Sequence, residues 1–260
     1  MIRYCKIKHC IIGFDRPKIC VALVGRSAEE IIAQADQIRQ SQRSSAIDMV
    51  ELRGDYLDIL PDYEVLDRLL AKVAEILPEK VLLFTIRSEA EGGEKLAFTT
   101  PTIYEINRHV IEKATADMVD IELFSGAEQA EEMIGIAKEK GVKIIMSNHD
   151  FQTTPDASTI VNRLRSMQDL GADVVKIAVM PENKLHVVNL LAATAMMQEA
   201  YAEVPVVTMS MGKMGAISRI SGQVFGSAIT FASFAEASAP GQIPVDKMDE
   251  ALTLIEKYCN

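Results

Sequence analysis

A single lysine, Lys176, stands in the middle of the largely apolar stretch 172–180, which consists of Ala-Asp-Val-Val-Lys-Ile-Ala-Val-Met. Its β-branched residues favour a strand that is covered on both faces, so we expect the lysine to be buried. Burial disfavours a charged ammonium, which makes a neutral, nucleophilic amine available near pH 7. Such an amine forms an imine with a carbonyl carbon. The alternative is a structural lysine that pairs with a carboxylate or reaches solvent from the strand end.

His149 is the candidate proton carrier, because an imidazole both removes and delivers protons near neutral pH. It lies in Ser-Asn-His-Asp, directly after another apolar run. The alternative is a histidine that caps a helix or fills the core. Glu91 follows a third apolar run and is a candidate to orient the imidazole. Taken alone, the Glu91 loop is more simply explained as a solvated turn.

Arginines at three strand ends, Arg53, Arg87 and Arg219, suggest a substrate that is anionic or rich in oxygen atoms, because guanidinium groups match carboxylates and paired acceptors. Glu51 closes the same apolar run as Arg53. The glycine-rich turn 211–215, just before Arg219, is similar to the phosphate sites that follow the seventh strand of many barrels. A carboxylate would suit this arginine equally well.

The segment 233–242 is rich in small residues and carries the polar residues Ser238 and Gln242. It is a candidate for a loop that closes over a bound ligand and excludes water. An ordinary connecting loop has the same composition, so composition does not separate the two.

Strands that alternate with helices must position these side chains. Eight apolar runs are predicted as strands: 19–24, 49–52, 81–86, 118–123, 142–146, 174–179, 204–210 and 225–231. Capping boxes at Ser27, Thr102 and Ser125 are predicted to open helices. Eight such units predict an α/β fold of the (β/α)8 TIM-barrel type as a single domain over 1–260, in which the candidate residues converge at the C-terminal ends of the strands. An open doubly wound sheet is the alternative, but no Gly-x-Gly-x-x-Gly follows the first strand.

The alternating segment 2–12 predicts an N-terminal β-hairpin within 1–17. The formal charge of −10, from 27 basic and 37 acidic residues, argues against nucleic acid or an anionic membrane surface as a partner. The four cysteines show no metal-ligand spacing. Without a signal segment or an apolar run of membrane-spanning length, we expect a cytoplasmic protein with reduced thiols.

Six motifs in this order resemble the type I 3-dehydroquinate dehydratases, the Schiff-base-forming dehydratases of the shikimate pathway. They are Val50-Glu-Leu-Arg53; Thr85-Ile-Arg-Ser88 with Glu91-Gly-Gly93; Ser147-Asn-His-Asp-Phe151 with Thr154-Pro155; Val175-Lys-Ile-Ala-Val-Met-Pro181; Met211-Gly-x-x-Gly-x-x-Ser-Arg219; and Ser238-Ala-Pro-Gly-Gln242. The resemblance spans nearly the whole chain. One departure is Ala22, which stands where some relatives carry serine.

The resemblance implies that the chain dehydrates 3-dehydroquinate to 3-dehydroshikimate through an imine on Lys176. It implies that His149 moves the protons while Glu91 holds the imidazole. The other positions would bind the substrate: Arg219 its carboxylate, Ser238 and Gln242 from the closing loop, and Glu51, Arg53 and Arg87 its ring hydroxyls. No metal or dissociable cofactor is implied, and a homodimer is expected.

Two other functions use the same sequence features. A class I aldolase or transaldolase-like barrel also places a Schiff-base lysine on the sixth strand, but the His149 and Glu91 pair beside Arg219 favours proton abstraction from a ring that bears a carboxylate. A catalytically idle barrel with a binding or regulatory role would tolerate the loss of Lys176 or His149, and both are present.

Overall fold

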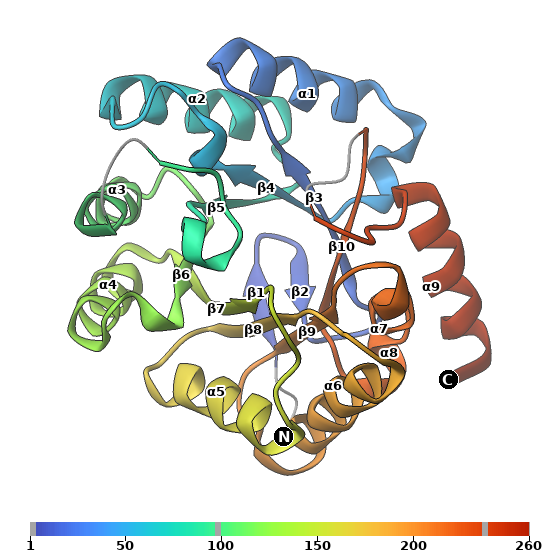
Figure 1. The fold of residues 1–260 in the computed structure, drawn as a ribbon. Helices are drawn as coiled ribbons and strands as arrows, with labels where there is room; N and C mark the ends of the chain where they lie inside the picture. The colour runs from blue at the N-terminus through green and yellow to red at the C-terminus, as the bar shows by residue number, and fades with distance from the viewer. Residues whose placement is uncertain (1–3, 97–99, 236–238, 260) are drawn as a thin grey trace.

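Eight parallel strands form a nearly closed barrel with helices around it, in a computed structural model that describes residues 4–96, 100–235 and 239–259 (Figure 1). The predicted TIM-barrel fold is confirmed. The strands are β3 (Lys18–Leu23), β4 (Met49–Arg53), β5 (Val81–Thr85), β6 (Met118–Glu122), β7 (Lys143–Asp150), β8 (Val174–Val179), β9 (Val206–Ser210) and β10 (Ile229–Ala232).

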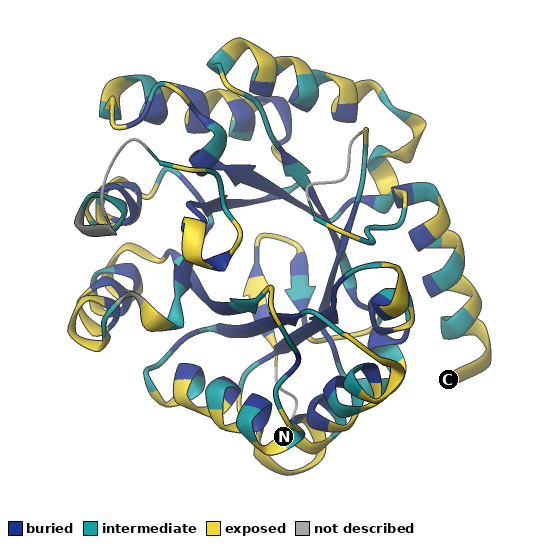
Figure 2. Cartoon of the chain, viewed as in Figure 1, coloured by how far each residue is buried: buried dark blue, intermediate teal, exposed yellow. Residues whose placement is uncertain are grey.

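The helices cover the outside of the barrel, burying one face and exposing the other (Figure 2). They are α1 (Ala28–Gln40), α2 (Tyr63–Ile76), α3 (Thr100–Lys113), α4 (Ala127–Lys140), α5 (Ala157–Asp169), α6 (Lys184–Met196), α7 (Ala216–Ile220), α8 (Gly222–Phe225) and α9 (Val245–Cys259). No helix in the described part of the chain is long and apolar enough to span a membrane.

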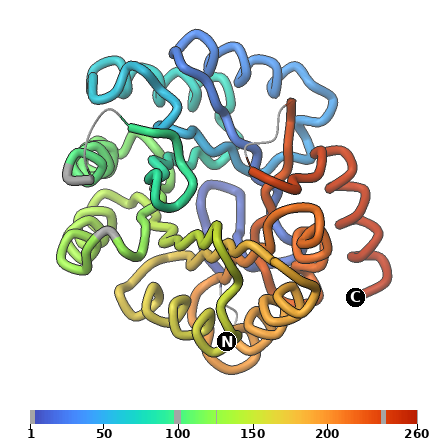
Figure 3. The backbone as a smooth tube through the Cα atoms, in the orientation of Figure 1, coloured from blue at the N-terminus to red at the C-terminus, as the bar shows by residue number. Residues whose placement is uncertain are grey.

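Closure of the barrel brings the two ends of the sheet together. β10 pairs with β3 in parallel, and the blue and orange-red segments lie side by side in the tube view (Figure 3). On the other side of β10, a single bridge joins Val206 of β9 to Ser227, just before β10 begins. The C-terminal ends of all eight strands therefore face one opening.

The predicted N-terminal hairpin is confirmed and lies across the opposite end of the barrel (Figure 1). Its strands β1 (Cys5–Ile7) and β2 (Cys10–Ile12) pair antiparallel. Ile7 and Ile12 pack against side chains from the first residues of the barrel strands, such as Met49 and Val81. The hairpin therefore covers the N-terminal ends of the strands and leaves the other end for chemistry.

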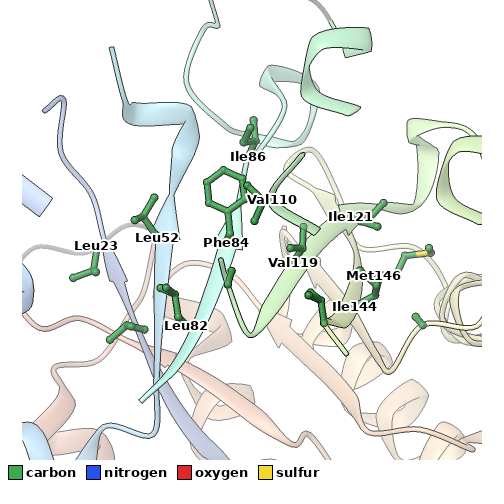
Figure 4. Packing of buried hydrophobic residues seen from close by; sticks show 14 of the residues in the cluster. Leu23, Leu52, Leu82, Phe84, Ile86, Val110, Val119, Ile121, Ile144 and Met146 are labelled. Atoms are coloured by element: carbon green, nitrogen blue, oxygen red, sulfur yellow. The ribbon is translucent and has the colours of Figure 1, made fainter. Parts of the chain in front are cut away.

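Two apolar clusters follow from the alternation of side chains along each strand. The larger lies between the barrel and its helices, as the side chains of Phe84 and Val119 beside Val110 of α3 illustrate (Figure 4). The smaller fills the barrel and contains Val174 and Ala178 of β8. Lys176 lies between these two residues and shares their inward face, as the strand pattern predicts.

Aspartates that directly precede three strands fix the register of the sheet at its closed end. Each accepts a backbone N–H from the neighbouring strand: Asp48 from Ile19 at 2.8 Å, Asp117 from Leu82 at 2.8 Å, and Asp173 from Ile144 at 2.9 Å. These contacts use the N–H groups where the ladder begins, which would otherwise lack a partner.

Several predicted boundaries require correction, although the Ser27 cap is confirmed, since its side chain accepts the N–H of Glu30. The strand predicted at 142–146 extends as β7 to Asp150, so His149 lies within the strand and not after it. The Thr102 capping box is wrong because α3 already begins at Thr100. The Ser125 box is wrong because Gly126 precedes α4 as its N-cap, without a side-chain hydrogen bond. The last strand does not span 225–231, because residues up to Phe225 form α8 and the strand begins at Ile229.

Candidate active site

Eight of the nine predicted site residues line one small cavity at the open end of the barrel. They are Glu51, Arg53, Arg87, Glu91, His149, Lys176, Arg219 and Gln242. The ninth, Ser238, lies outside the described residues. Strands deliver four of these side chains, those of Glu51, Arg53, His149 and Lys176, and segments that follow the strands deliver the other four. The C-terminal ends of the strands meet at one opening, which is why residues far apart in the sequence meet here.

Lys176 is buried, with 3% of its surface exposed, and it is paired. Its Nζ lies 3.2 Å from Oδ2 of Asp120 and 4.6 Å from the centre of the Phe231 ring. From the sequence, a lysine paired with a carboxylate was the alternative to a nucleophile, and Lys176 does pair with the carboxylate of Asp120.

Asp120 is the main site residue that the sequence interpretation missed. It is 1% exposed, and it accepts hydrogen bonds from Arg87 Nη2 at 2.8 Å and Ser147 Oγ at 2.6 Å. Burial by itself raises the pKa of Asp120, but the charges of Arg87 and Lys176, helped by these hydrogen bonds, lower it to about 2. The signal was present in the sequence, because Asp120 interrupts the apolar run of β6 just as Lys176 interrupts that of β8.

His149 and Glu91 form a buried pair. Oε2 of Glu91 lies 2.9 Å from Nδ1 of His149 and accepts the His149 backbone N–H at 2.9 Å, while its Oε1 accepts from Asn148 at 3.0 Å. A carboxylate at Nδ1 assigns the ring proton to that nitrogen and leaves Nε2 as the proton acceptor. The orienting role predicted for Glu91 is consistent with this geometry.

The charge states of this pair differ from those of isolated side chains. Burial, and then the nearby cations Arg87 and Lys176, place the pKa of His149 well below 6.5. Burial, and then the charge of Glu122, raise the pKa of Glu91 to about 7. The imidazole is therefore neutral at pH 7, ready to accept a proton, rather than poised near neutrality as the residue type alone suggests.

Two glycines bring the Glu91 turn close to its neighbours. A Cβ on Gly92, which has a φ of +82°, would lie 2.2 Å from the Phe151 ring. A Cβ on Gly93 would lie 2.0 Å from the carbonyl oxygen of Arg87. Only residues without a Cβ fit this short turn, which folds Glu91 back against the end of β7.

Arg219 is a buried guanidinium with no ion pair to any carboxylate in the described part of the chain. It is 2% exposed, donates to the carbonyl oxygens of Pro240 at 3.1 Å and Phe231 at 3.4 Å, and has no hydrogen-bond partner at Nε. Burial lowers its pKa to about 10. By contrast, Arg53 forms a bidentate pair with Asp55 at 2.8 and 2.7 Å. Arg219 is therefore the cation that best suits an incoming anion.

Comparisons with known proteins agree with this geometry. The family model for type I 3-dehydroquinase matches residues 19–259. The chain belongs to the type I 3-dehydroquinase family. It is 43% identical to the 3-dehydroquinate dehydratase of Salmonella typhimurium over 251 residues, which is 96% of this chain and 98% of that protein. This family match favours the dehydratase interpretation over the aldolase alternative.

Solved structures of the family superpose along the whole chain. The type I 3-dehydroquinate dehydratase from Clostridium difficile, solved with covalently modified comenic acid, has a TM-score of 0.93 at 40% identity and covers 99% of each chain. The enzyme from Geobacillus kaustophilus has a TM-score of 0.94 at 32% identity, with 99% of this chain and 98% of that chain covered.

A second, larger hollow of about 700 Å³ shares the Glu91 and His149 pair with the small cavity. Its remaining walls come from α3, α4, α5 and the segments at the ends of β5 to β7. Lys176 and Arg219 line only the smaller cavity. The smaller cavity therefore contains both the lysine predicted to form the imine and the arginine predicted to bind an anion.

Arg87 was predicted only as a substrate ligand, but it also joins the acidic residues of the site. Its Nη1 donates to Glu122 at 3.0 Å and to Ser147 at 2.9 Å, and its Nη2 donates to Asp120. Glu122 was missed from the sequence because an acidic residue at a strand end is ordinary in a surface loop. Among the described residues, no group of three or more His, Cys, Asp or Glu side chains is arranged to hold a metal ion.

Proposed function

We propose that Lys176, His149 and Glu91 perform the dehydration of 3-dehydroquinate to 3-dehydroshikimate, the third step of the shikimate pathway. As a member of its family the chain is a carbon–oxygen lyase that catalyses this reaction. One observation carries the assignment of residues: the amine of Lys176 shares a cavity with a neutral imidazole and a guanidinium that has no ion pair among the described residues.

The imine supplies the electron sink that the elimination needs. The neutral amine of Lys176 attacks the C3 ketone, and the resulting carbinolamine loses water to give an iminium ion. Nε2 of His149 takes the C2 proton, and the electron pair moves toward the iminium nitrogen. The imidazolium then gives a proton to the departing C1 hydroxyl, which leaves as water. Hydrolysis of the imine consumes one water, releases the product and restores the amine.

Glu91 supports both roles of the histidine. Its carboxylate faces Nδ1, which holds Nε2 toward the reacting proton and stabilises the imidazolium while it exists. Because burial keeps the pKa of His149 low, the imidazolium is a stronger acid than an exposed one. A strong acid is useful here, because hydroxide is a poor leaving group and must depart as water.

The cations of the site suit the substrate's oxygens. Arg219 binds the carboxylate of 3-dehydroquinate and fixes the ring relative to Lys176. Gln242 and Ser238 approach from the loop, and Glu51, Arg53 and Arg87 bind ring hydroxyls from the barrel wall. Since Arg53 and Arg87 already pair with carboxylates, their remaining donors contribute hydrogen bonds rather than net charge.

We also propose a homodimer in the cytoplasm. The resemblance to the family supports the homodimer. The cytoplasm is supported by free cysteines at 5, 10 and 20, which are buried, and by the free, exposed Cys259. Sedimentation equilibrium at micromolar concentrations tests the assembly, and a monomer over that range would overturn it.

Borohydride trapping tests the catalytic assignment. With 3-dehydroquinate present, borohydride is expected to reduce the imine, inactivate the enzyme and leave an adduct on Lys176 that peptide mass spectrometry locates. Lys80→Met is a matched control, because Lys80 is a partly buried lysine outside the cavity that bonds to backbone carbonyls. The Lys80→Met variant should form the same trapped adduct as the wild type. Dehydration without any adduct would exclude the imine mechanism.

Replacement of His149 by alanine separates imine formation from elimination. The variant is expected to form the trapped adduct slowly and to lose nearly all production of the conjugated enone-carboxylate, which absorbs in the ultraviolet. The same absorbance assay in the presence of a chelator tests metal independence. Full turnover by the variant would remove His149 from the mechanism.

A further inference from the structure

Asp120 has no role in the steps above, yet among the described residues it is the carboxylate that pairs with the catalytic nitrogen, at 3.2 Å. We propose that Asp120 is the fixed counterion of Lys176: a positioning residue that aims the amine and balances the positive charge that returns to the same nitrogen in the iminium ion. This inference rests on the imine chemistry proposed above.

The surroundings of Asp120 hold its carboxylate in one orientation. Ser147 Oγ donates to Oδ1, and Arg87 Nη2 donates to Oδ2, the oxygen that faces Lys176. Asp120, Ser147 and Lys176 lie on the neighbouring strands β6, β7 and β8, where Ser147 and Lys176 are Cα partners. Groups held by adjacent strands keep their geometry better than groups on loops. The amine is therefore directed from a rigid support.

The charge on the lysine nitrogen changes twice in one cycle. It is lost when the ammonium releases its proton, and it returns when the carbinolamine loses water to form the iminium ion. Arg219 lines the same cavity and has no ion pair among the described residues, so its charge repels the iminium charge. Glu51 and Glu91 also line this cavity, but Asp120 is the carboxylate that the structure places in contact with the Lys176 nitrogen. Asp120 opposes that repulsion, and a charge 1% exposed acts strongly because little water screens it.

The same contact has a cost. Asp120 favours the ammonium form of Lys176, which is not nucleophilic, as well as the iminium form. Removing the charge of Asp120 should therefore ease the first deprotonation and weaken the later iminium state. These opposite effects distinguish a counterion from a residue that only maintains the fold.

The test compares Asp120→Asn with Asp173→Asn in borohydride trapping and steady-state dehydration from pH 5 to 9. A hydrogen bond to a charged group contributes a factor of roughly 10 to 100, so kcat of Asp120→Asn is expected to fall by about that factor. The acid limb of its trapping rate is expected to move to lower pH. Asp173→Asn is the matched control. Like Asp120, Asp173 is an aspartate that accepts a hydrogen bond from a lysine, but it lies at the closed end of the barrel, where it bonds Lys143 and the backbone N–H of Ile144. The Asp173→Asn variant should leave both quantities unchanged.

Ser147→Ala keeps every charge and removes the hydroxyl that donates to Asp120 and accepts from Arg87. Its kcat should fall severalfold with the acid limb unmoved, and this variant decides the positioning role if Asp120→Asn fails to fold. Asp120→Asn with kcat within twofold of the wild type, an unmoved acid limb, or Ser147→Ala with full activity would each overturn the proposal. Failure of the wild type itself to form an adduct would instead overturn the imine mechanism.

Discussion

Replacing Arg219 by methionine is expected to stabilise the free protein while it weakens substrate binding. Burial lowers the pKa of Arg219 from 12.5 to about 10, and the group is 2% exposed. At about 1.4 kcal/mol per pKa unit, the buried charge costs about 3 kcal/mol. Because pH 7 lies below both the folded and the unfolded pKa, the full cost is present there and is relieved only as the pH rises through about 10.

The methionine also leaves two carbonyl oxygens without their donor, those of Phe231 and Pro240. Each lost hydrogen bond costs about 1 kcal/mol. The net expectation is a gain of about 1 kcal/mol in the free energy of unfolding of the free enzyme. Removing most polar contacts from a core lowers the free energy of unfolding. An increase on substitution is therefore specific to a buried cation that has no anionic partner in the free enzyme.

Binding should change in the other direction. Charge-assisted hydrogen bonds to a carboxylate contribute about 1.5–3 kcal/mol, so KM for 3-dehydroquinate is expected to rise by roughly 10- to 100-fold in Arg219→Met. Product should raise the unfolding free energy of the wild type and have little effect on the variant, because ligand stabilisation follows affinity.

Urea denaturation with and without product, together with initial-rate kinetics, measures both changes. Arg39→Met is the control, because Arg39 is an exposed arginine on α1 that pairs with Asp36. Its unfolding free energy should stay within about 0.5 kcal/mol of the wild type. An Arg219→Met enzyme that is less stable than the wild type and retains a normal KM would refute the argument that Arg219 is held unpaired for a substrate anion.

Three further results follow from the Glu91 turn. Because the pKa of Glu91 is raised from 4.5 to about 7, its carboxylate costs stability as the pH rises through that interval. The free energy of unfolding of Glu91→Gln, measured by urea denaturation, should therefore rise relative to that of the wild type by up to about 3 kcal/mol between pH 4 and 8. A difference that does not depend on pH would contradict this. Nitrogen NMR should find the His149 imidazole neutral at pH 6. An imidazole that titrates near pH 6.5 would contradict the argument that burial lowers the pKa of His149. Gly93→Ala should lower the free energy of unfolding by about 1–3 kcal/mol and reduce activity, because the added Cβ clashes with the Arg87 carbonyl. Gly135→Ala is the control, because a Cβ at this position on α4 meets open space. Equal stability of the two variants would contradict the steric argument.

Local sequence signals were sufficient where hydrophobic period and length agreed. The runs of β8 and β4 predicted their strands to within a residue at each end. They failed near β10, where an apolar run begins in the short helix α8. A run of that length fits a buried helix as well as a strand, so only packing against the rest of the barrel separates the two.

The sequence by itself determined most of the charged side chains that line the cavity, although it missed Asp120, the partner of Lys176. A charged residue inside an apolar strand is too costly to be accidental, and barrel topology places strand ends together, so most of the predicted residues line the cavity. The tertiary structure alone decided how they pair. It gave Lys176 a carboxylate, kept His149 neutral, raised the pKa of Glu91 and left Arg219 without an ion pair among the described residues. These properties depend on burial and on distances of a few ångströms between groups on different strands, which no pattern along one strand contains.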